Sequence, residues 1–335
     1  MLKTVTLITA VLAAMFVCLS GLPAVPVLSA AWRRRSQRDD PTKKSDRAPG
    51  GLLLAVGTLA AFWVGFLLAD SQLAPNGYTG GFRTALTLFG AAALFGLVGL
   101  SVDGLRYVRH GRRPARWARL LLQLFAAAFL TAQMAVNGEL TTALRLPGVG
   151  TVQLGRWFYP LVVLLLLALV TAADLCSDVD GITVSTGFTT ALTLLIVAIL
   201  LLEPDIPGDH FVAALFTAAL AGGCVGFLFW NYYPARVAAG ASGSYFLAGG
   251  FGAAVLYFGR PELLLTATLV WWAPAAAALI RCLTKSGKGR GPRENAPWHV
   301  LPEKGWGLPT LTALGCVIGA VGGLLTVLLL LMGRL

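Results

Sequence analysis

Long apolar segments recur along the chain, and they constrain its fold more than any other feature. A bilayer core of about 30 Å is crossed by about 20 apolar residues in an α-helix. Segments of roughly this length cover residues of about 4–30, 51–69, 82–102, 118–137, 157–173, 184–202, 211–229, 244–259, 262–281 and 308–332. The pattern predicts an all-α, polytopic membrane protein with about ten transmembrane helices, in a single integral membrane domain of residues 1–335.

The composition excludes the main alternatives to a membrane protein. Of 335 residues, 57% are hydrophobic and only 12% are charged, against about 25% charged in an ordinary soluble domain. A soluble protein of this size could not keep so much apolar surface from water, and intrinsic disorder requires low hydrophobicity with high charge. The five cysteines lie far apart without a CxxC pair, so the sequence predicts neither a zinc site nor a disulfide framework.

The first apolar segment has two interpretations. Lys3 precedes an apolar run that ends in small residues, as in a signal peptide. The run continues to Ala31 and then meets the arginines of 33–35, and a basic cluster in this position retains a helix in the membrane. The sequence therefore predicts an uncleaved first helix.

The distribution of basic residues predicts the orientation of the helices. Of the 26 Lys and Arg residues, 20 lie in the loops and flanking helix ends on one side of the ten-helix topology. That side is predicted to be cytoplasmic, with both termini outside. Nine of the 15 acidic residues lie on that side too, so the predicted cytoplasmic side carries the whole formal net charge of +11. We expect this charge to attract anionic lipid and phosphate groups, and nucleic acid is not needed to explain it.

Acidic residues gather in one predicted cytoplasmic loop. Asp174, Asp178 and Asp180 lie within seven residues, with no Lys or Arg beside them in the sequence. Like charges so close together repel one another unless a cation or a hydrogen-bond donor binds them. Two interpretations stay open on spacing alone: a site for a metal or a nucleotide, and a solvated helix end. Asp103 stands at a second cytoplasmic helix end.

A glycine-rich loop and a histidine are further candidates on the same side. Gly240, Gly243 and Ser244 stand at the start of a predicted helix, where backbone N–H groups and a hydroxyl can hold an anion. Glycine-rich turns between membrane helices are common, so an ordinary turn is the alternative. His299 lies in the last predicted cytoplasmic loop, and a single loop histidine is more often incidental than catalytic.

Several cytoplasmic segments carry recognisable motifs. Residues 231–235 and 240–244 have the sequences Asn-Tyr-Tyr-Pro-Ala and Gly-Ala-Ser-Gly-Ser. Residues 174–182 have the sequence Asp-Leu-Cys-Ser-Asp-Val-Asp-Gly-Ile, and residues 297–303 Pro-Trp-His-Val-Leu-Pro-Glu. Taken in their order along the chain, these segments resemble the motifs of the phospho-N-acetylmuramoyl-pentapeptide transferase family. This family lies within the wider group of polyprenyl-phosphate sugar-1-phosphate transferases. The resemblance covers most of the chain, from near residue 38 to near residue 306.

The resemblance is close in the glycine and proline framework and weaker at charged positions. Tyr233 stands where the family has a histidine, and Ala241 where it has a metal-binding aspartate. Ser177 replaces an aspartate, Asp174 replaces an asparagine, and Val102 replaces the first aspartate of a pair. The positions that agree include Asp103, Asp180, Gly181, Asn231, Pro234, Ala235, Gly240, Gly243, Ser244 and His299.

The resemblance implies an enzyme of the bacterial cytoplasmic (inner) membrane, with its active face toward the cytoplasm. It implies transfer of phospho-N-acetylmuramoyl-pentapeptide, or a similar phospho-sugar, from a UDP-sugar to polyprenyl phosphate. The products are a lipid-linked cell-wall precursor and UMP, and Mg²⁺ is the implied cofactor. The implied partners are the UDP-sugar, the polyprenyl phosphate and the lipid bilayer, with a homodimer as a further candidate and no nucleic acid.

The resemblance also implies roles for individual residues. Asp103 and Asp180 would handle the metal or the phosphate acceptor, and His299 the diphosphate. Asn231 and Asp174 would contact the nucleotide. The remaining assignments are Asp178 as a further metal ligand, Gly240, Gly243 and Ser244 as a substrate-binding turn, and Lys43, Arg116 and Arg119 as groups that attract the anionic substrate.

Two functions stay open. The first is a membrane transferase of this family. The second is a catalytically silent paralogue that binds lipid phosphate, a nucleotide sugar or a partner protein, because Ala241 removes a magnesium ligand. A transporter is disfavoured, since its site is expected near mid-membrane and these carboxylates stand at predicted helix ends.

Overall fold

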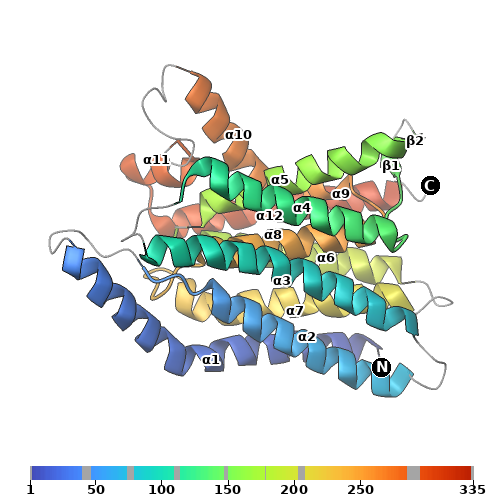
Figure 1. Ribbon diagram of the computed structural model, residues 1–335, viewed down its shortest axis with the longest axis horizontal. Coiled ribbons are helices and arrows are strands. Elements are labelled where there is room, and N and C mark those ends of the chain that lie inside the picture. Colours follow the sequence, from blue (N-terminus) through green and yellow to red (C-terminus); the bar gives the residue numbers. More distant parts are fainter. Residues whose placement is uncertain are drawn as a thin grey trace.

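The computed structural model shows a bundle of helices packed side by side (Figure 1). The described residues are 2–39, 47–73, 79–108, 114–146, 150–177, 179–202, 208–284 and 295–332. The helices are α1 (Leu2–Asp39), α2 (Gly51–Leu73), α3 (Thr79–Val108), α4 (Arg116–Val136), α5 (Phe158–Cys176), α6 (Ile182–Leu201), α7 (Gly208–Asn231), α8 (Gly240–Tyr257), α9 (Leu263–Ala267), α10 (Leu269–Leu283), α11 (Pro297–Glu303) and α12 (Leu308–Met332). A short 3-10 helix (Gly155–Trp157) and two strands, β1 (Ala143–Leu146) and β2 (Gly150–Gln153), complete the elements.

Eight of the described helices are long and apolar enough to cross a membrane: α1 to α7 and α12. This confirms the prediction of an all-α, polytopic membrane protein. Two further predicted segments, 244–259 and 262–281, correspond to α8 and to the pair α9 and α10. The count of ten transmembrane helices, the outward position of both termini and the homodimer stay predictions.

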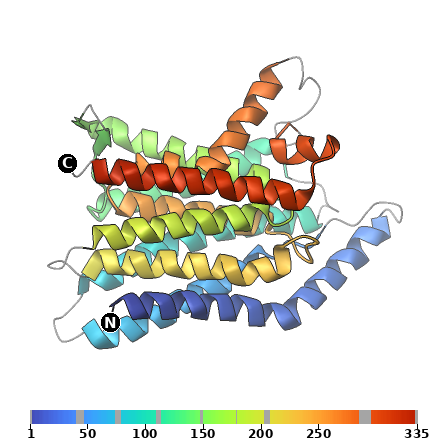
Figure 2. The same cartoon turned by 180° about the vertical axis from the view of Figure 1, so that it is seen from behind.

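The segment predicted as one helix over 262–281 is interrupted at Thr268, between α9 and α10. The φ and ψ angles of Thr268 are −107° and 22°, away from α-helical values. Its hydroxyl donates to the Leu264 carbonyl oxygen at 2.5 Å and accepts from the Trp272 Nε1–H at 2.7 Å. The Thr268 hydroxyl therefore forms hydrogen bonds with a carbonyl group and an indole N–H at the point where the helix breaks. Beyond the break, α10 leans away from the bundle in both views (Figures 1 and 2).

The bundle has two layers with α8 between them. In one layer α12, α6, α7 and α1 lie side by side in that order (Figure 2). In the other, α5, α4, α3 and α2 follow one another (Figure 1). α8 contacts helices of both layers, and every residue from Gly240 to Leu256 is buried. Large apolar side chains are exposed on outer helices such as α1, α4 and α12, as expected where helices face lipid.

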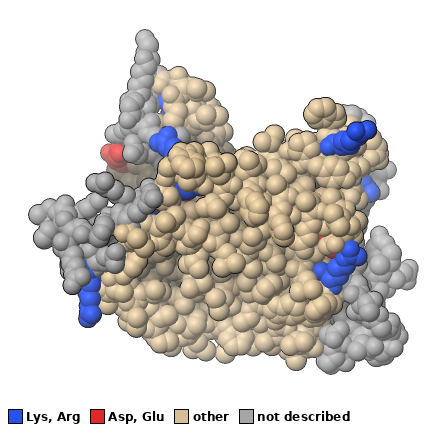
Figure 3. Space-filling model, in the orientation of Figure 1, with Lys and Arg blue, Asp and Glu red and all other residues tan. Residues whose placement is uncertain are grey.

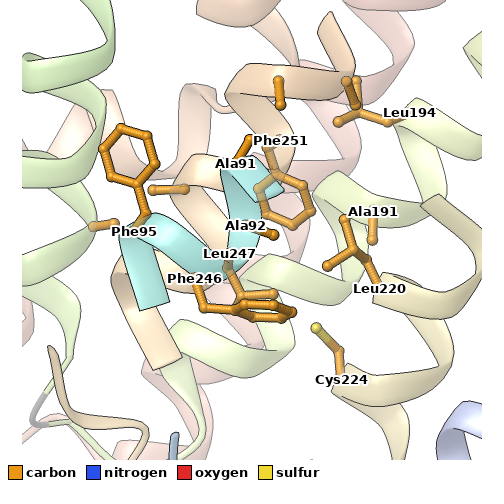
Figure 4. Packing of buried hydrophobic residues seen from close by; sticks show 14 of the residues in the cluster. Ala91, Ala92, Phe95, Ala191, Leu194, Leu220, Cys224, Phe246, Leu247 and Phe251 are labelled. Carbon is orange, nitrogen blue, oxygen red and sulfur yellow. The ribbon is translucent and has the colours of Figure 1, made fainter. Parts of the chain in front are cut away.

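Apolar side chains of α3, α6, α7 and α8 meet around the central helix. Figure 4 shows Phe246 and Phe251 of α8 between Phe95 of α3 and Leu220 of α7. Gly249 leaves room for the Phe95 ring, because a Cβ built on Gly249 would lie 2.5 Å from it. The core is therefore closely packed directly beside α8.

Small residues bring α1 and α7 into backbone contact. A Cβ built on Gly222 would lie 1.9 Å from the Ala10 carbonyl oxygen, and one built on Gly226 would lie 2.3 Å from the Ala14 carbonyl oxygen. Small residues permit this close approach between membrane helices. A larger residue at either position must push α1 away from α7.

Charged side chains lie near the two ends of the bundle on the face shown in Figure 3, with a broad uncharged band between them. This is the surface expected of a protein whose middle lies in hydrocarbon. At one end, β1 and β2 form an antiparallel hairpin with Ala143 opposite Gln153, between α4 and α5. The sequence did not predict this hairpin. Nearby, Arg83 donates to the Asn137 Oδ1 at 2.9 Å.

Substitution of Gly222 tests the contact between α1 and α7. Gly222→Ala is expected to lower the free energy of unfolding by about 1–3 kcal/mol, because the new methyl group overlaps the α1 backbone. Gly90→Ala in α3 is the matched control, since a Cβ there meets nothing within 4 Å. Alanine is favoured over glycine in a helix by about 1 kcal/mol, so this control should be at least as stable as the parent. Equal thermal unfolding midpoints for the two variants in detergent would contradict the contact.

Candidate functional site

One end of the bundle brings together the residues that the sequence singled out. Here α3, α5 and α7 end, α2, α4, α6 and α8 begin, and α11 lies beside them (Figure 1). From α1 to α8, consecutive helices run in opposite directions, so alternate loops of the chain meet at the same end. We call this region the site end, and it comprises residues 47–50, 103, 116–119, 174–177, 179–182, 231–244 and 295–303.

The carboxylate of Asp103 caps the first turn of α8. Its Oδ1 accepts from the Ala241 N–H at 3.1 Å, and its Oδ2 accepts from the Ser242 N–H at 2.9 Å and the Ser242 hydroxyl at 2.7 Å. The first N–H groups of a helix lack partners within it and carry partial positive charge, so an anion is stabilised there. Asp103 is only 5% exposed, and it supplies this anion from within the chain.

Glycine and serine residues at the start of α8 allow Asp103 and α2 to approach its first turn closely. Gly240 has a φ of +68°, and a Cβ built on it would lie 2.7 Å from the Asp103 Oδ2. A Cβ on Gly243 would lie 3.2 Å from the α2 backbone, and the Ser244 hydroxyl donates to the Gly240 carbonyl oxygen at 2.8 Å. An anion-binding turn would need the first N–H groups of α8, and two of these are already bound to Asp103.

Asp180 lies in a closed cluster with Arg47 and Ala235, which we call the Arg47 cluster. A guanidinium nitrogen of Arg47 forms an ion pair with the Asp180 Oδ1. The Arg47 Nε–H donates to the Ala235 carbonyl oxygen at 2.9 Å, and the Ala235 N–H donates to the Asp180 Oδ2 at 3.3 Å. The Asp180 side chain is 1% exposed and the Arg47 side chain 39% exposed. The carboxylate of the Arg47 cluster is therefore buried, whereas its guanidinium group is partly exposed to solvent.

Burial and charge act on Asp180 in opposite directions. Removal from water raises the pKa of the Asp180 carboxyl group, because it penalises the ionised form. The positive charge of Arg47 and the hydrogen bond from Ala235 lower the same pKa, and burial is the larger effect. The Arg47 charge therefore offsets part of the cost of a carboxylate at this position.

Backbone pairing holds the loops of the Arg47 cluster together. The Ala238 N–H donates to the Ala48 carbonyl oxygen at 2.9 Å, and the Gly50 N–H donates to the Ala238 carbonyl oxygen at 2.7 Å. This is a short parallel bridge between the segment before α2 and the α7–α8 loop. A Cβ built on Gly50 would lie 2.9 Å from the Val237 side chain, so the two segments are in close contact.

Asp174 has a cation of its own. The Arg119 Nη1 lies 2.7 Å from the Asp174 Oδ2, and both side chains are largely buried. One turn further along α4, the Gln123 Oε1 accepts from the Thr171 hydroxyl at 3.1 Å. These contacts join α4 to α5, whereas Arg116 at the start of α4 is exposed.

Asn231, the last residue of α7, and His299 of α11 also lie at the site end. Asn231 is 1% exposed, and its Nδ2 donates to the Val237 carbonyl oxygen at 2.9 Å, which closes the α7–α8 loop. Its Oδ1 is buried without a hydrogen-bond partner. His299 is half-buried beside Trp298, whose Nε1–H donates to the Cys176 Sγ at 3.1 Å. This bond holds α11 against the end of α5.

Most of the predicted site residues therefore lie at the site end, and their roles stay predictions. These residues are Asp103, Arg116, Arg119, Asp174, Asp180, Asn231, Gly240, Gly243, Ser244 and His299. Lys43 and Asp178 lie outside the described residues. Sequence reasoning did not single out Arg47, although the Pro-Gly-Gly turn that follows it was a signal for a structured segment.

Magnesium, which the family resemblance implies, does not fit the described side chains. No group of three or more His, Cys, Asp and Glu residues in the described part of the chain is arranged to hold a metal ion. Asp103, Asp174 and Asp180 are each bound by a positive or hydrogen-bond-donating group of the chain. Ala241 is buried and offers no side-chain oxygen. A divalent cation would have to displace these internal partners.

Comparison with known proteins identifies the family. The sequence profile described as glycosyl transferase family 4 matches residues 84–259, which is more than half of the chain. The chain belongs to this family. It is 29% identical over 322 residues to the phospho-N-acetylmuramoyl-pentapeptide-transferase of Acetivibrio thermocellus, covering 91% of both chains. It is also 29% identical over 322 residues to the protein of that name from Desulforudis audaxviator, covering 90% of this chain and 92% of that one.

Membership of glycosyl transferase family 4 confirms the resemblance and supports a membrane transferase of phospho-sugars that serves cell-wall synthesis. A further relative of the same name, from Heliobacterium modesticaldum, is 35% identical over 173 residues, or 51% of each chain. The family match contains Asp103, Asp174 and Asp180, whereas Arg47 lies before it.

Substitution of Asp103 tests the cap on α8. Asp103→Asn is expected to lower the free energy of unfolding by about 1–3 kcal/mol, because an NH₂ group then faces the hydrogen-bond donors of α8. Glu303→Gln, at an exposed position of the same end, is the control and should change stability little. Thermal unfolding midpoints in detergent measure both effects. An Asp103→Asn protein as stable as the parent would contradict the capping role.

Proposed function

We propose that the chain moves phospho-N-acetylmuramoyl-pentapeptide, or a similar phospho-sugar, from a UDP-sugar to polyprenyl phosphate. The products are a lipid-linked cell-wall precursor and UMP. The observation that carries this proposal is the similarity to phospho-N-acetylmuramoyl-pentapeptide-transferases over 91% of both chains. The gathering of the matched residues at one end of the bundle supports it.

The proposed reaction exchanges one phosphorus–oxygen bond for another. An oxygen of the lipid phosphate attacks the sugar-bound phosphorus of the UDP-sugar. A new bond forms as the bond to UMP breaks, and UMP leaves with the bonding electron pair. Two anions must approach each other, so the work of the protein is positioning and neutralisation of charge.

The described residues suit binding of the nucleotide and the diphosphate. We assign Asn231 and Asp174 to the nucleotide, since the buried Asn231 Oδ1 lacks a partner and can accept from a ligand N–H. Arg119 orients Asp174 through their ion pair. His299 is assigned to the diphosphate, and the exposed Arg116 to attraction of the anionic substrate.

The same proposal places the protein in the bacterial cytoplasmic (inner) membrane, with the site end toward the cytoplasm. The loops predicted to be cytoplasmic carry 20 of the 26 Lys and Arg residues, as expected for cytoplasmic loops. The UDP-sugar would then arrive from the cytoplasm, and the polyprenyl phosphate from the bilayer.

Release of UMP tests the transferase. The full-length protein, purified in detergent, would be incubated with UDP-N-acetylmuramoyl-pentapeptide and undecaprenyl phosphate, with Mg²⁺ in one arm and EDTA in the other. The expected result is UMP above that of an empty-membrane control in at least one arm. No UMP in either arm would contradict the transferase and favour the silent paralogue.

A matched pair of asparagines tests the nucleotide assignment. Asn231→Ala is expected to lower kcat/KM for the UDP-sugar by about tenfold or more, because a buried hydrogen bond to the ligand is lost. Asn137→Ala, at the opposite end of the bundle, should leave kcat/KM unchanged. Unfolding midpoints of both variants verify that they fold. An unchanged kcat/KM in Asn231→Ala would show that this residue does not contact the nucleotide.

A further inference from the structure

Positive charge at the site end is supplied by the chain itself. Two of the three described aspartates there are paired with arginines, Asp180 with Arg47 and Asp174 with Arg119. The third, Asp103, is bound to the amides and a hydroxyl of α8. A phosphate ligand nevertheless needs positive charge or hydrogen-bond donors around its oxygens. Arginines are therefore described groups that can provide them directly, whereas the described aspartates are already bound within the chain.

Arg47 is better placed than Arg119 to meet a phosphate group. A guanidinium group has five N–H donors, and Arg47 directs one to Asp180 and one to Ala235. The Arg47 side chain is also considerably exposed, while its carboxylate partner is covered. In the Arg119–Asp174 pair both side chains are largely buried. The remaining donors of Arg47 form a fork that matches two phosphate oxygens.

The Arg47 cluster orients this guanidinium before any ligand arrives. Asp180 and Ala235 bind the guanidinium group on one side. The parallel bridge between Pro49 and Ala238 holds the backbone just after Arg47. A side chain that is already ordered loses less conformational entropy on binding. Arg236, on the same loop, is also exposed, with its guanidinium carbon 5.5 Å from the centroid of the Trp230 ring.

We propose that the Arg47 guanidinium binds a substrate phosphate group directly, and that phosphate binding at the site end needs no divalent cation. Asp180 is then a positioning residue for Arg47 and not a metal ligand. The proposal rests on the proposed function for the identity of the two phosphate ligands, a nucleoside diphosphate and a polyprenyl phosphate. It departs from the magnesium that the family resemblance implies.

Binding with and without divalent cations tests this proposal. The full chain in detergent, which includes Asp178, would be titrated by calorimetry with UDP and, separately, with undecaprenyl phosphate. Each titration would be made in EDTA and in Mg²⁺. We expect at least one probe to bind with Kd values that agree within about threefold between the two conditions. Binding of both probes only in Mg²⁺, or no binding of either, would overturn the proposal.

Substitution of Arg47 identifies the bound phosphate. Arg47→Gln is expected to weaken binding in EDTA by about tenfold or more, and Arg47→Lys should restore part of it because the charge returns. The control is Arg83→Gln, an exposed arginine at the opposite end, which should leave binding unchanged. Weakened UDP binding would assign Arg47 to the nucleotide, and weakened undecaprenyl phosphate binding to the lipid. Unchanged binding of both probes to Arg47→Gln would overturn the proposal.

Substitution of Asp180 separates a positioning role from a metal-binding role. Asp180→Asn keeps an oxygen that accepts from Arg47, so binding in EDTA should stay within about threefold of the parent. A loss of binding that appears only in Mg²⁺ would assign Asp180 to a metal and overturn the proposal. The double variant Arg47→Gln/Asp180→Asn avoids a buried unpaired carboxylate. It should keep the parental unfolding midpoint and still bind weakly, and parental affinity in this variant would also overturn the proposal.

Failure of this inference and failure of the proposed function give different results. UMP release that occurs only with Mg²⁺, with binding that also needs Mg²⁺, would support the transferase and contradict metal-free binding. Binding in EDTA that depends on Arg47, without UMP release in either arm, would support the phosphate site and contradict transfer.

Discussion

A carboxylate buried at the end of an apolar helix bundle needs a hydrogen-bond donor or a cation beside it, and this requirement organises the site end. Asp103 meets it with the first turn of α8, which joins the central helix to α3. Asp180 meets it with Arg47, which joins the segment before α2 to the α7–α8 loop. Because α8 lies between the two helix layers, the position of its first turn determines where the neighbouring loops can lie.

Length and hydropathy predict the membrane helices because lipid imposes the same requirement on every spanning segment. The break at Thr268 depends on contacts of one hydroxyl with Leu264 and Trp272, and hydropathy does not show such contacts. The β1–β2 hairpin has strands of four residues, which are too short to leave a clear alternating pattern. Both features therefore appear only in the structure.

The sequence also places the site residues at one end, since alternate loops of a helical bundle meet there, but it does not show their partners. Asp180 and Arg47 are 133 residues apart, and Asp103 and Ala241 are 138 apart, so no local spacing reveals either contact. The sequence leaves two interpretations open for the cluster at 174–180, a metal or nucleotide site and a solvated helix end. In the structure two of its carboxylates are largely buried, each beside an arginine from another loop or helix.

The charge of the three buried aspartates at the site end is thus balanced within the chain, by arginines and by the first turn of α8. Titration of the purified full chain with Mn²⁺, followed by the electron paramagnetic resonance signal of the free ion, tests this balance most directly. We predict no saturable Mn²⁺ site that depends on Asp103 or Asp180. Saturable binding of one Mn²⁺ per chain that is abolished by Asp180→Asn, with the unfolding midpoint unchanged, would contradict it.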